Sequence, residues 1–464
     1  MKHIRSRFSL LRGDASDRGM GITEVIFAMA IFMIISVGVA YATLSTLRLA
    51  ADSRAREVAA NLAASEIDKA RANGDPLTLF NSSRTVTIDG LDYTIVRTAG
   101  WVSSSGSSSG CGTGTGALQY KQVDVKVSWT TKLAMTADVR ANTIVAPVTR
   151  INDPSYGTIL VSALTAAGTP SEGIPVTVTA TSSGAPVTMD ATDVDGCSYA
   201  FKVTPGTYTV SVNKSGYVDS KQAATSITTG VTVVAGSAVS VPFQYDKAAT
   251  FTLNYANNQA ATANKLFPSN LDTSFISTYG LFQISSGTPS SIALHPFSSG
   301  YAVVAGKYKA PVAAVPPAPA VPGCLSPDPT SWAAGTVGTT ALKAGVRAPN
   351  VAASPGGSAA MGIPMGVATF KYTGVKDRYI VAKTVAPPAG SGNPGCDTGM
   401  TYVFSPKLVN GSTYSVALPF GSWSLYTSAT NTGSGTLTPI TDAMAGAVTG
   451  LPSVSVITLD PRTP

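Results

Sequence analysis

Histidine and charge are both scarce in this sequence. Its 464 residues include 2 histidines, His3 and His295, and charged residues make up 12% of the chain, about half of the roughly 25% usual in globular proteins. Two histidines far apart argue against a His-dependent catalytic triad and against a histidine metal centre. Beyond the first 19 residues no dense cluster of Lys and Arg follows, so no nucleic-acid partner is predicted.

Motifs for cofactors and metals are missing as well. The 4 cysteines form no C-x-x-C pair, so neither a zinc site nor a thioredoxin-like motif is predicted. The glycine-rich stretch 110–116 lacks the Lys-Ser/Thr ending of a phosphate-binding loop, and we expect residues 103–116 to form a solvated loop. Asp190, Asp193 and Asp195 match a calcium loop only in part, which favours a hairpin turn. A non-enzyme without cofactor or metal is predicted, and a glycosidase with paired carboxylates is the open alternative.

A long apolar run near the amino terminus is the strongest positive signal. Val25–Leu47 contains no charged residue, and a helix of this length crosses a hydrocarbon core of about 30 Å. Basic residues precede the run, which predicts a single-pass helix with a cytoplasmic amino terminus and the rest of the chain outside. These residues are Lys2, Arg5, Arg7, Arg12 and Arg18.

The same helix is expected to continue beyond the apolar run. Residues 48–73 are rich in Ala, Leu, Glu, Lys and Arg, which favour helix. Gly74-Asp75-Pro76 is a stop signal. We predict one helix over residues 20–74, apolar over 20–47, with a buried stripe on its second half. The stripe consists of Leu49, Val58, Leu62 and Ile67.

Glu24 stands at the start of the apolar run, where a plain membrane anchor would avoid a carboxylate because burying it unpaired is costly. The segment GMGITEVIFAMAIF, which contains it, resembles the type IV prepilin cleavage and methylation motif. The resemblance implies that residues 1–19 are a leader, that a prepilin peptidase cuts after Gly19, and that Met20 becomes the methylated amino terminus. Glu24 is then the fifth mature residue, whereas a competing cut after Gly21 would make it the third.

The resemblance also implies a role for Glu24 in assembly. Its carboxylate would pair with the amino group of Met20 on a neighbouring subunit, which cancels two charges inside an apolar helical bundle and sets the axial register. The implied partners are the prepilin peptidase, the cytoplasmic membrane and other pilin subunits. The chain would lie in the cytoplasmic membrane before assembly and on the cell surface, in a fibre, afterwards.

Residues 75–147 are predicted to form a small antiparallel sheet, the head of the pilin. Asp89-Gly90 is a hairpin signal. Residues 120–131 alternate strictly, with Val123, Val125, Val127 and Trp129 on one face, as in a half-buried strand. The order of leader, helix and short meander is similar to that of minor pilins of the PilV type.

The distal part of the chain is predicted to be β-structure. Phrases such as EGIPVTVTAT and VTPGTYTVSV within 156–245 resemble prealbumin-like modules of the carboxypeptidase regulatory and collagen-adhesin B-repeat kind. That resemblance implies a seven-stranded sandwich that serves as a stalk or display module. Residues 246–464 are predicted to be β-rich, with a possible second sandwich at 357–430. The proline-rich stretch 311–323 is expected to be a stiff linker or loop.

Four cysteines suit an extracytoplasmic chain, in which disulfides persist. Cys324 and Cys396 both follow Pro-Gly in loop-like sequence, and a bridge between them is favoured. Cys111 and Cys197 would then pair with each other or stay free. The tyrosines and phenylalanine of the distal region are expected in the core rather than on a ligand surface: Tyr255, Phe282, Tyr301 and Tyr308.

Together these patterns predict an α+β chain, with a long amino-terminal transmembrane helix packed on a small antiparallel sheet and followed by all-β sandwich domains of prealbumin-like or Ig-like kind. The predicted function is a minor type IV pilin or pilin-like subunit that displays distal β modules to an unidentified surface ligand. Two alternatives stay open. One is a pseudopilin of a type II secretion or DNA-uptake machine, and the other is a membrane-anchored adhesin outside any fibre.

Overall fold

The structure is a computed structural model that divides into two compact units. The first unit comprises residues 1–99 and 120–148, and the second comprises residues 100–119 and 149–464. The structure describes residues 21–104, 106, 108–109, 111, 116–131, 135–147, 151, 153–181, 187–260, 264–315, 318–445 and 456–464. Within these, one long apolar helix is followed by β-sheets in sandwich-like pairs, which confirms the predicted fold class.

The first unit is built on one uninterrupted helix, α1 (Ile22–Asn73). It ends where the stop signal predicts, because Gly74 adopts φ 65°, a left-handed conformation that glycine reaches without strain. Asp75 then accepts a hydrogen bond from the backbone N–H of Leu77 and opens a short 3₁₀ turn, η1 (Pro76–Thr78).

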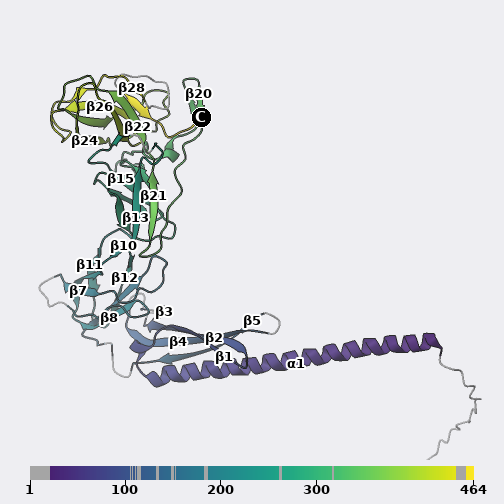
Figure 1. Cartoon of the computed structure of the whole chain (residues 1–464). Coiled ribbons are helices and arrows are strands. Elements are labelled where there is room, and N and C mark those ends of the chain that lie inside the picture. The colour runs from purple at the N-terminus through teal and green to yellow at the C-terminus, as the bar shows by residue number, and fades with distance from the viewer. Residues whose placement is uncertain are drawn as a thin grey trace, which may run out of the picture. The chain divides into compact units, whose positions relative to one another are not determined.

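A sheet with the strand order β1–β2–β4–β5 covers the second half of α1 (Figure 1). The predicted hairpin at Asp89-Gly90 is confirmed, since Ile88 pairs with Leu91 and both turn residues have positive φ, as a tight two-residue turn requires. The strands are β1 (Ser82–Ile88), β2 (Leu91–Ser103), β3 (Ser108–Ser109, paired with β2), β4 (Leu118–Thr130) and β5 (Thr136–Val145).

The core of the head lies between α1 and this sheet. The predicted inward face of β4 is confirmed, because Val123, Val125, Val127 and Trp129 are all buried. The predicted helix stripe is wrong in part: Leu49 is 66% exposed and Val58 and Leu62 are half-buried. Alanines form most of the buried stripe instead, since their small side chains let the helix approach the large residues of the sheet. The buried helix residues are Ala55, Ala59, Ala63, Glu66, Ile67 and Ala70.

Residues 157–247 form a sandwich of seven strands, in sheets ordered β10–β12–β6–β8 and β11–β9–β7. Its core is a cluster of mostly valines that includes Val161, Val178 and Val210, together with the fully buried Tyr245. The strands are β6 (Gly157–Leu164), β7 (Val176–Ala180), β8 (Cys197–Val203), β9 (Gly206–Asn213), β10 (Tyr217–Asp219), β11 (Thr225–Val233) and β12 (Ala238–Lys247).

Residues 100–119, expected to include a solvated loop, are instead part of the second unit. Trp101 and Cys111 are buried, the Trp101 ring lies 6.4 Å from that of Tyr199, and Gly116 accepts a backbone hydrogen bond from Ala238. Much of the predicted loop, residues 103–116, lies outside the described residues. At Cys111 the prediction is wrong, because the partner that helps to bury this residue comes from the sandwich, far along the chain.

The remaining strands lie between Ala249 and Leu459, and most of them contribute residues to one large core over that range. They are β13 (Ala249–Tyr255), β14 (Lys265–Leu266), β15 (Thr273–Ser277), β16 (Gly280–Ile284), β17 (Ser291–Leu294), β18 (Ala302–Ala305), β19 (Gly335–Val337), β20 (Thr340–Leu342), β21 (Ser358–Ile363), β22 (Gly366–Lys371), β23 (Tyr379–Thr384), β24 (Thr401–Lys407), β25 (Thr413–Leu418), β26 (Gly421–Ser428), β27 (Thr438–Pro439), β28 (Met444–Ala445) and β29 (Ile457–Leu459), with one 3₁₀ turn, η2 (Pro329–Ser331).

The stretch suggested as a second sandwich, 357–430, does not close on itself. Its first strand, β21, pairs in parallel with β13, and β25 pairs in parallel with β14. The sheet β14–β25–β22–β28 takes a strand from each side of the stretch. The sheet β24–β23–β26–β27, with β29 on β26, takes two strands from the carboxyl side of the stretch.

The proline-rich stretch 311–323 is not an extended linker, because it folds back on itself. Val312 and Val321 exchange two backbone hydrogen bonds, and so do Val315 and Ala318. Pro319 lies between these two pairs, and Pro311 and Pro322 lie between the Val312–Val321 pair and the next pair outward, Lys309 with Cys324. A residue without an N–H is tolerated there, since it has no partner to lose.

Candidate functional site

The first half of α1 offers an extended apolar surface. Its most apolar window has a mean hydropathy of 2.5, and 0% of that window is buried, so α1 is long and apolar enough to cross a membrane. Ile26, Phe27 and Phe32 are 59%, 72% and 72% exposed. Apolar surface on this scale requires a bilayer or other helices around it.

Glu24 is the acidic residue in the first turn of α1, and its backbone N–H donates to the carbonyl of Gly21. A carboxylate at this end of a helix is favoured by the helix dipole. Glu24 and the apolar residues after it are exposed, so its side chain is open to a partner. The predicted cleavage residues Gly19 and Met20 lie outside the described residues.

A buried ion-pair cluster fixes the second half of α1 to the head sheet. Glu66 is 5% exposed, and its carboxylate oxygens lie 2.9 Å from Arg84 Nη2 and 3.1 Å from Arg97 Nη1. Burial raises the pKa of Glu66. The hydrogen bond and charge of Arg84, with the charges of Lys69 and Arg97, outweigh burial and hold that pKa below its usual value.

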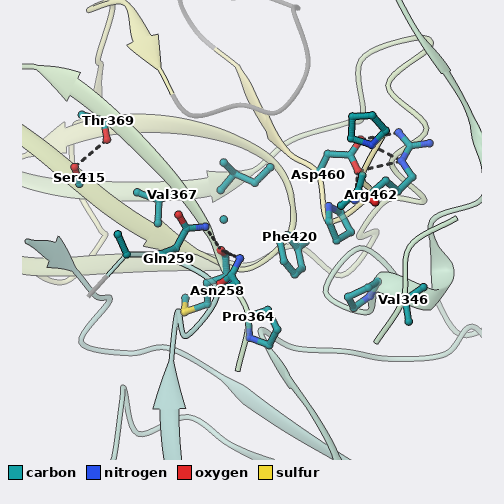
Figure 2. Close-up of a pocket in the computed structure, with 18 residues that line it drawn as sticks. Asn258, Gln259, Val346, Pro364, Val367, Thr369, Ser415, Phe420, Asp460 and Arg462 are labelled. Atoms are coloured by element: carbon teal, nitrogen blue, oxygen red, sulfur yellow. Dashed lines mark hydrogen bonds and ion pairs between the residues drawn. The ribbon is translucent and has the colours of Figure 1, made fainter. Parts of the chain in front are cut away.

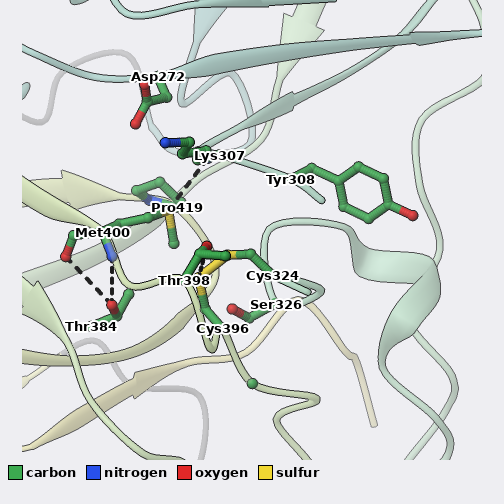
Figure 3. The surroundings of a disulfide bond; sticks show 12 residues. Asp272, Lys307, Tyr308, Cys324, Ser326, Thr384, Cys396, Thr398, Met400 and Pro419 are labelled. Carbon is green, nitrogen blue, oxygen red and sulfur yellow. Dashed lines mark hydrogen bonds between the residues drawn. A yellow bond between two sulfur atoms is a disulfide. The ribbon is translucent and has the colours of Figure 1, made fainter. Parts of the chain in front are cut away.

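Two disulfides hold the second unit. Cys324 pairs with Cys396, as favoured from the sequence, and Cys111 pairs with Cys197. The first bond joins the base of the proline-rich ribbon to the loop before β24 (Figure 3). The second joins residues 100–119 to β8, the first residue of which is Cys197.

The central carboxylate of the Asp-rich turn before β8 stabilises the turn. Asp193 Oδ1 accepts hydrogen bonds from the backbone N–H groups of Asp195 and Cys197, both at 2.9 Å. These bonds form a side-chain-stabilised turn. The turn is not part of the hairpin favoured from the sequence, because β8 pairs with β6. Across the residues that the structure describes, no group of three or more His, Cys, Asp and Glu side chains is placed to hold a metal ion.

A closed ring of hydrogen bonds joins the sandwich to the region that follows it. Gln222 accepts from the His295 N–H at 2.6 Å and donates to Tyr301 Oη at 2.9 Å, and Tyr301 Oη donates to the His295 carbonyl at 2.7 Å. The His295 imidazole is fully buried, with Nδ1 3.0 Å from the carbonyl of Val218. Burial lowers the pKa of His295, against the opposing effects of Val218, Asp246 and Asp219.

The aromatic residues expected in the distal core mostly lie there. Tyr301 is 1% exposed, and Tyr255 and Phe282 pack against the same core. Tyr308 is half-buried.

Of the contacts above, the sequence did not predict those of Glu66, Gln222 and His295. A carboxylate on the buried side of a helix with two arginines in the following strands was the only available signal, and nothing marked the partners of His295.

A cavity of about 590 Å³ lies on the outer side of β22 and β25 (Figure 2). Figure 2 shows Gln259, Thr369 and Ser415 on one side and the Asp460–Arg462 pair on the other, with Phe420 between them. Its volume falls in the range of roughly 300–1,000 Å³ typical of ligand sites.

No family model and no curated protein matches the chain. Among solved structures, it is similar to the Bacillus anthracis TIE protein, at 10% identity over 76% of this chain and 70% of that one, with a TM-score of 0.18. A streptococcal ancillary pilin is 9% identical over 52% and 75%, with a TM-score of 0.18. BcpA, the major pilin subunit of Bacillus cereus, is 14% identical over 61% and 92%, with a TM-score of 0.17. TM-scores this low carry no argument about function.

Proposed function

We propose that this chain is a minor type IV pilin or pilin-like subunit. A prepilin peptidase cuts it after Gly19, Met20 is methylated, and the chain enters a surface fibre through its helix. The role is structural and adhesive rather than catalytic. One observation carries the proposal: α1 is a single helix whose first half is exposed and apolar with one acid, Glu24, at its start, and whose second half is buried under a sheet.

The two halves of α1 suit two different surroundings. Residues 22–49 span about 42 Å at 1.5 Å per residue, enough for a bilayer or for the interior of a helical bundle. The alanine stripe and Glu66 hold the other half against the head. Such a chain can leave the membrane for a fibre without refolding its head, because the head core does not involve the apolar half.

A substitution at Glu24 tests this proposal. Glu24→Gln removes the charge that would pair with the amino terminus of Met20 on a neighbouring subunit. We expect the amount of this protein in sheared fibres to fall by at least about tenfold, since an unpaired ammonium group in an apolar bundle is costly. The measurement is a quantitative immunoblot of the sheared and membrane fractions.

Glu57→Gln is the matched control, because Glu57 is an exposed residue on the same helix beyond the apolar half. It should leave fibre incorporation unchanged. Equal incorporation of Glu24→Gln and the unmodified chain would contradict the assembly role. A chain that keeps residues 1–19 and stays with the membranes would instead be an anchored adhesin.

A further inference from the structure

The cavity on β22 and β25 is lined by side chains on the face of a sheet and does not include a strand edge. Val367 and Thr369 are half-buried and alternate with the buried Ala368 and Phe370, so they face outward from the sheet. Peptides that bind by strand addition pair with the edge of a sheet. A cavity on the face of a sheet does not offer that mode.

The charged side chains that line the cavity are paired with each other. Among its lining residues the charged side chains are Asp460 and Arg462, which lie 2.7 Å apart with 0% and 1% of their side chains exposed. Arg462 also donates to the carbonyls of Ser391 and Ala333. These bonds use most of the guanidinium N–H groups, and the ion pair with Asp460 neutralises both charges, so neither side chain is a free counter-charge for an ionic ligand.

Neutral hydrogen-bonding groups remain available on the opposite side. Thr369 Oγ1 and Ser415 Oγ share one hydrogen bond at 2.8 Å, and two hydroxyls joined by one bond keep one proton to donate. Asn258 and Gln259 each donate one hydrogen bond to the Met365 carbonyl. Asn258 Oδ1 also accepts a hydrogen bond from the Met365 backbone N–H at 3.0 Å. Asn258 therefore keeps one N–H and one lone pair, and Gln259 keeps a second N–H and acceptor capacity on its oxygen.

Apolar surface completes the lining, contributed by Phe420, Pro364, Val367 and Leu459. A ligand that fits must combine apolar faces with several uncharged hydroxyl groups. Pyranose sugars have this combination, because their C–H faces lie on apolar side chains while their hydroxyls both donate and accept.

We propose that this cavity binds a neutral saccharide. The proposal deepens the adhesive role above and rests on it only for its biological use, since binding is measured on the isolated chain. A neutral sugar would place its C–H face on the half-buried Val367 and Pro364 and its hydroxyls against Gln259, Thr369 and Ser415.

The test is isothermal calorimetry of the purified full chain in zwitterionic micelles, which avoids detergents with sugar headgroups. The probes are maltoheptaose, cellohexaose, chitohexaose and lacto-N-tetraose, with a sialylated lactose as a charged comparison. We expect at least one neutral probe to bind in the micromolar to millimolar range. The sialylated probe should bind no better.

The double variant Gln259→Leu with Thr369→Val should weaken that binding by about tenfold or more, since hydroxyls of the ligand then lose their partners. Thr252→Val, on the exposed face of β13, is the matched control and should bind as the parent does. Near-ultraviolet circular dichroism checks that each variant is folded. Absence of binding by every neutral probe, equal binding by the double variant, or preference for a charged probe or a peptide would overturn the proposal.

Discussion

Individual charged residues differ in how much they contribute to the stability of the fold. Glu66 is buried between two arginines, one of which, Arg97, has only 17% of its side chain exposed. Removing one partner of a buried pair is more damaging than the pair itself is stabilising, because the remaining charge is left desolvated. The Glu66 cluster therefore matters more for the head than the exposed pair of Arg140 and Asp138 on β5, which is open to solvent and screened.

Glu66→Gln should destabilise the contact between α1 and the sheet by roughly 3 kcal/mol. Hydrogen exchange in peptides that cover β1 and β2 measures this locally, which suits a chain of several domains. Asp68→Asn, at an exposed position two residues away, should change exchange little. Because the pKa of Glu66 lies below 4.5, this stabilisation is present at neutral pH and is lost as pH falls through that lowered value. Equal exchange in the two variants would contradict the account.

His295 should make the second unit sensitive to mild acid. Its pKa is lower in the folded chain than the usual 6.5, so the unfolded chain binds the proton more readily. The stability contributed by the neutral, buried ring is complete above about pH 6.5 and declines as pH falls below it. His295→Gln should flatten that decline.

Thermal unfolding at about pH 5 and about pH 8 provides the measurement. His3 is the only other histidine in the chain. The same loss of stability in His295→Gln as in the parent chain would assign the pH dependence to the carboxylates instead.

At the scale of elements, the sequence predicted what local patterns encode. The end of α1 at Gly74, the hairpin at Asp89-Gly90 and the inward face of β4 all follow from turn chemistry or from a period of two. The alanine stripe of α1 escaped prediction, because a search for large apolar residues overlooks small ones. The parallel pairing of β13 with β21 escaped as well, since no local signal specifies a partner so far along the chain.

The prediction for residues 100–119 was limited in the same way, because no local signal specifies the distant residues that this segment contacts. Its glycine and serine content predicts a solvated loop, whereas the disulfide from Cys111 to Cys197 ties the segment to the sandwich. Of the candidate site, the sequence predicted the apolar helix, Glu24 and the favoured cysteine pair. The sequence could not predict the cavity on β22 and β25, because the residues that line this cavity come from segments as far apart as Gln259 and Arg462.

The double variant Cys111→Ser with Cys197→Ser should release residues 100–119 from the sandwich. We expect proteinase K, which cuts without a strict sequence preference, to cleave within residues 100–119 much faster than in the parent chain, with a loss of stability of about 2–4 kcal/mol. Mass spectrometry of limited digests identifies the cut. Cys324→Ser with Cys396→Ser, which removes the other disulfide, should leave this cut slow. Unchanged cutting in the first variant would show that the remaining contacts suffice.

At the scale of the whole molecule, one helix and one head are followed by a much longer distal part. Residues 149–464 belong to the second unit, and each subunit that carries them adds this load to a fibre. A low copy number or a place at the tip suits such a chain better than repetition along a shaft. Under the proposed function, the sandwich of residues 157–247 and the larger core beyond it would be the parts that are displayed.

Mass spectrometry of the amino-terminal peptide, taken from fibres sheared off cells, tests the central claim most directly. The account predicts a peptide that begins at N-methylated Met20 and contains Glu24 as its fifth residue. That one result would establish the cut after Gly19, the register of Glu24 and incorporation into the fibre. A chain that retains residues 1–19 and occurs with the membranes alone would contradict the claim.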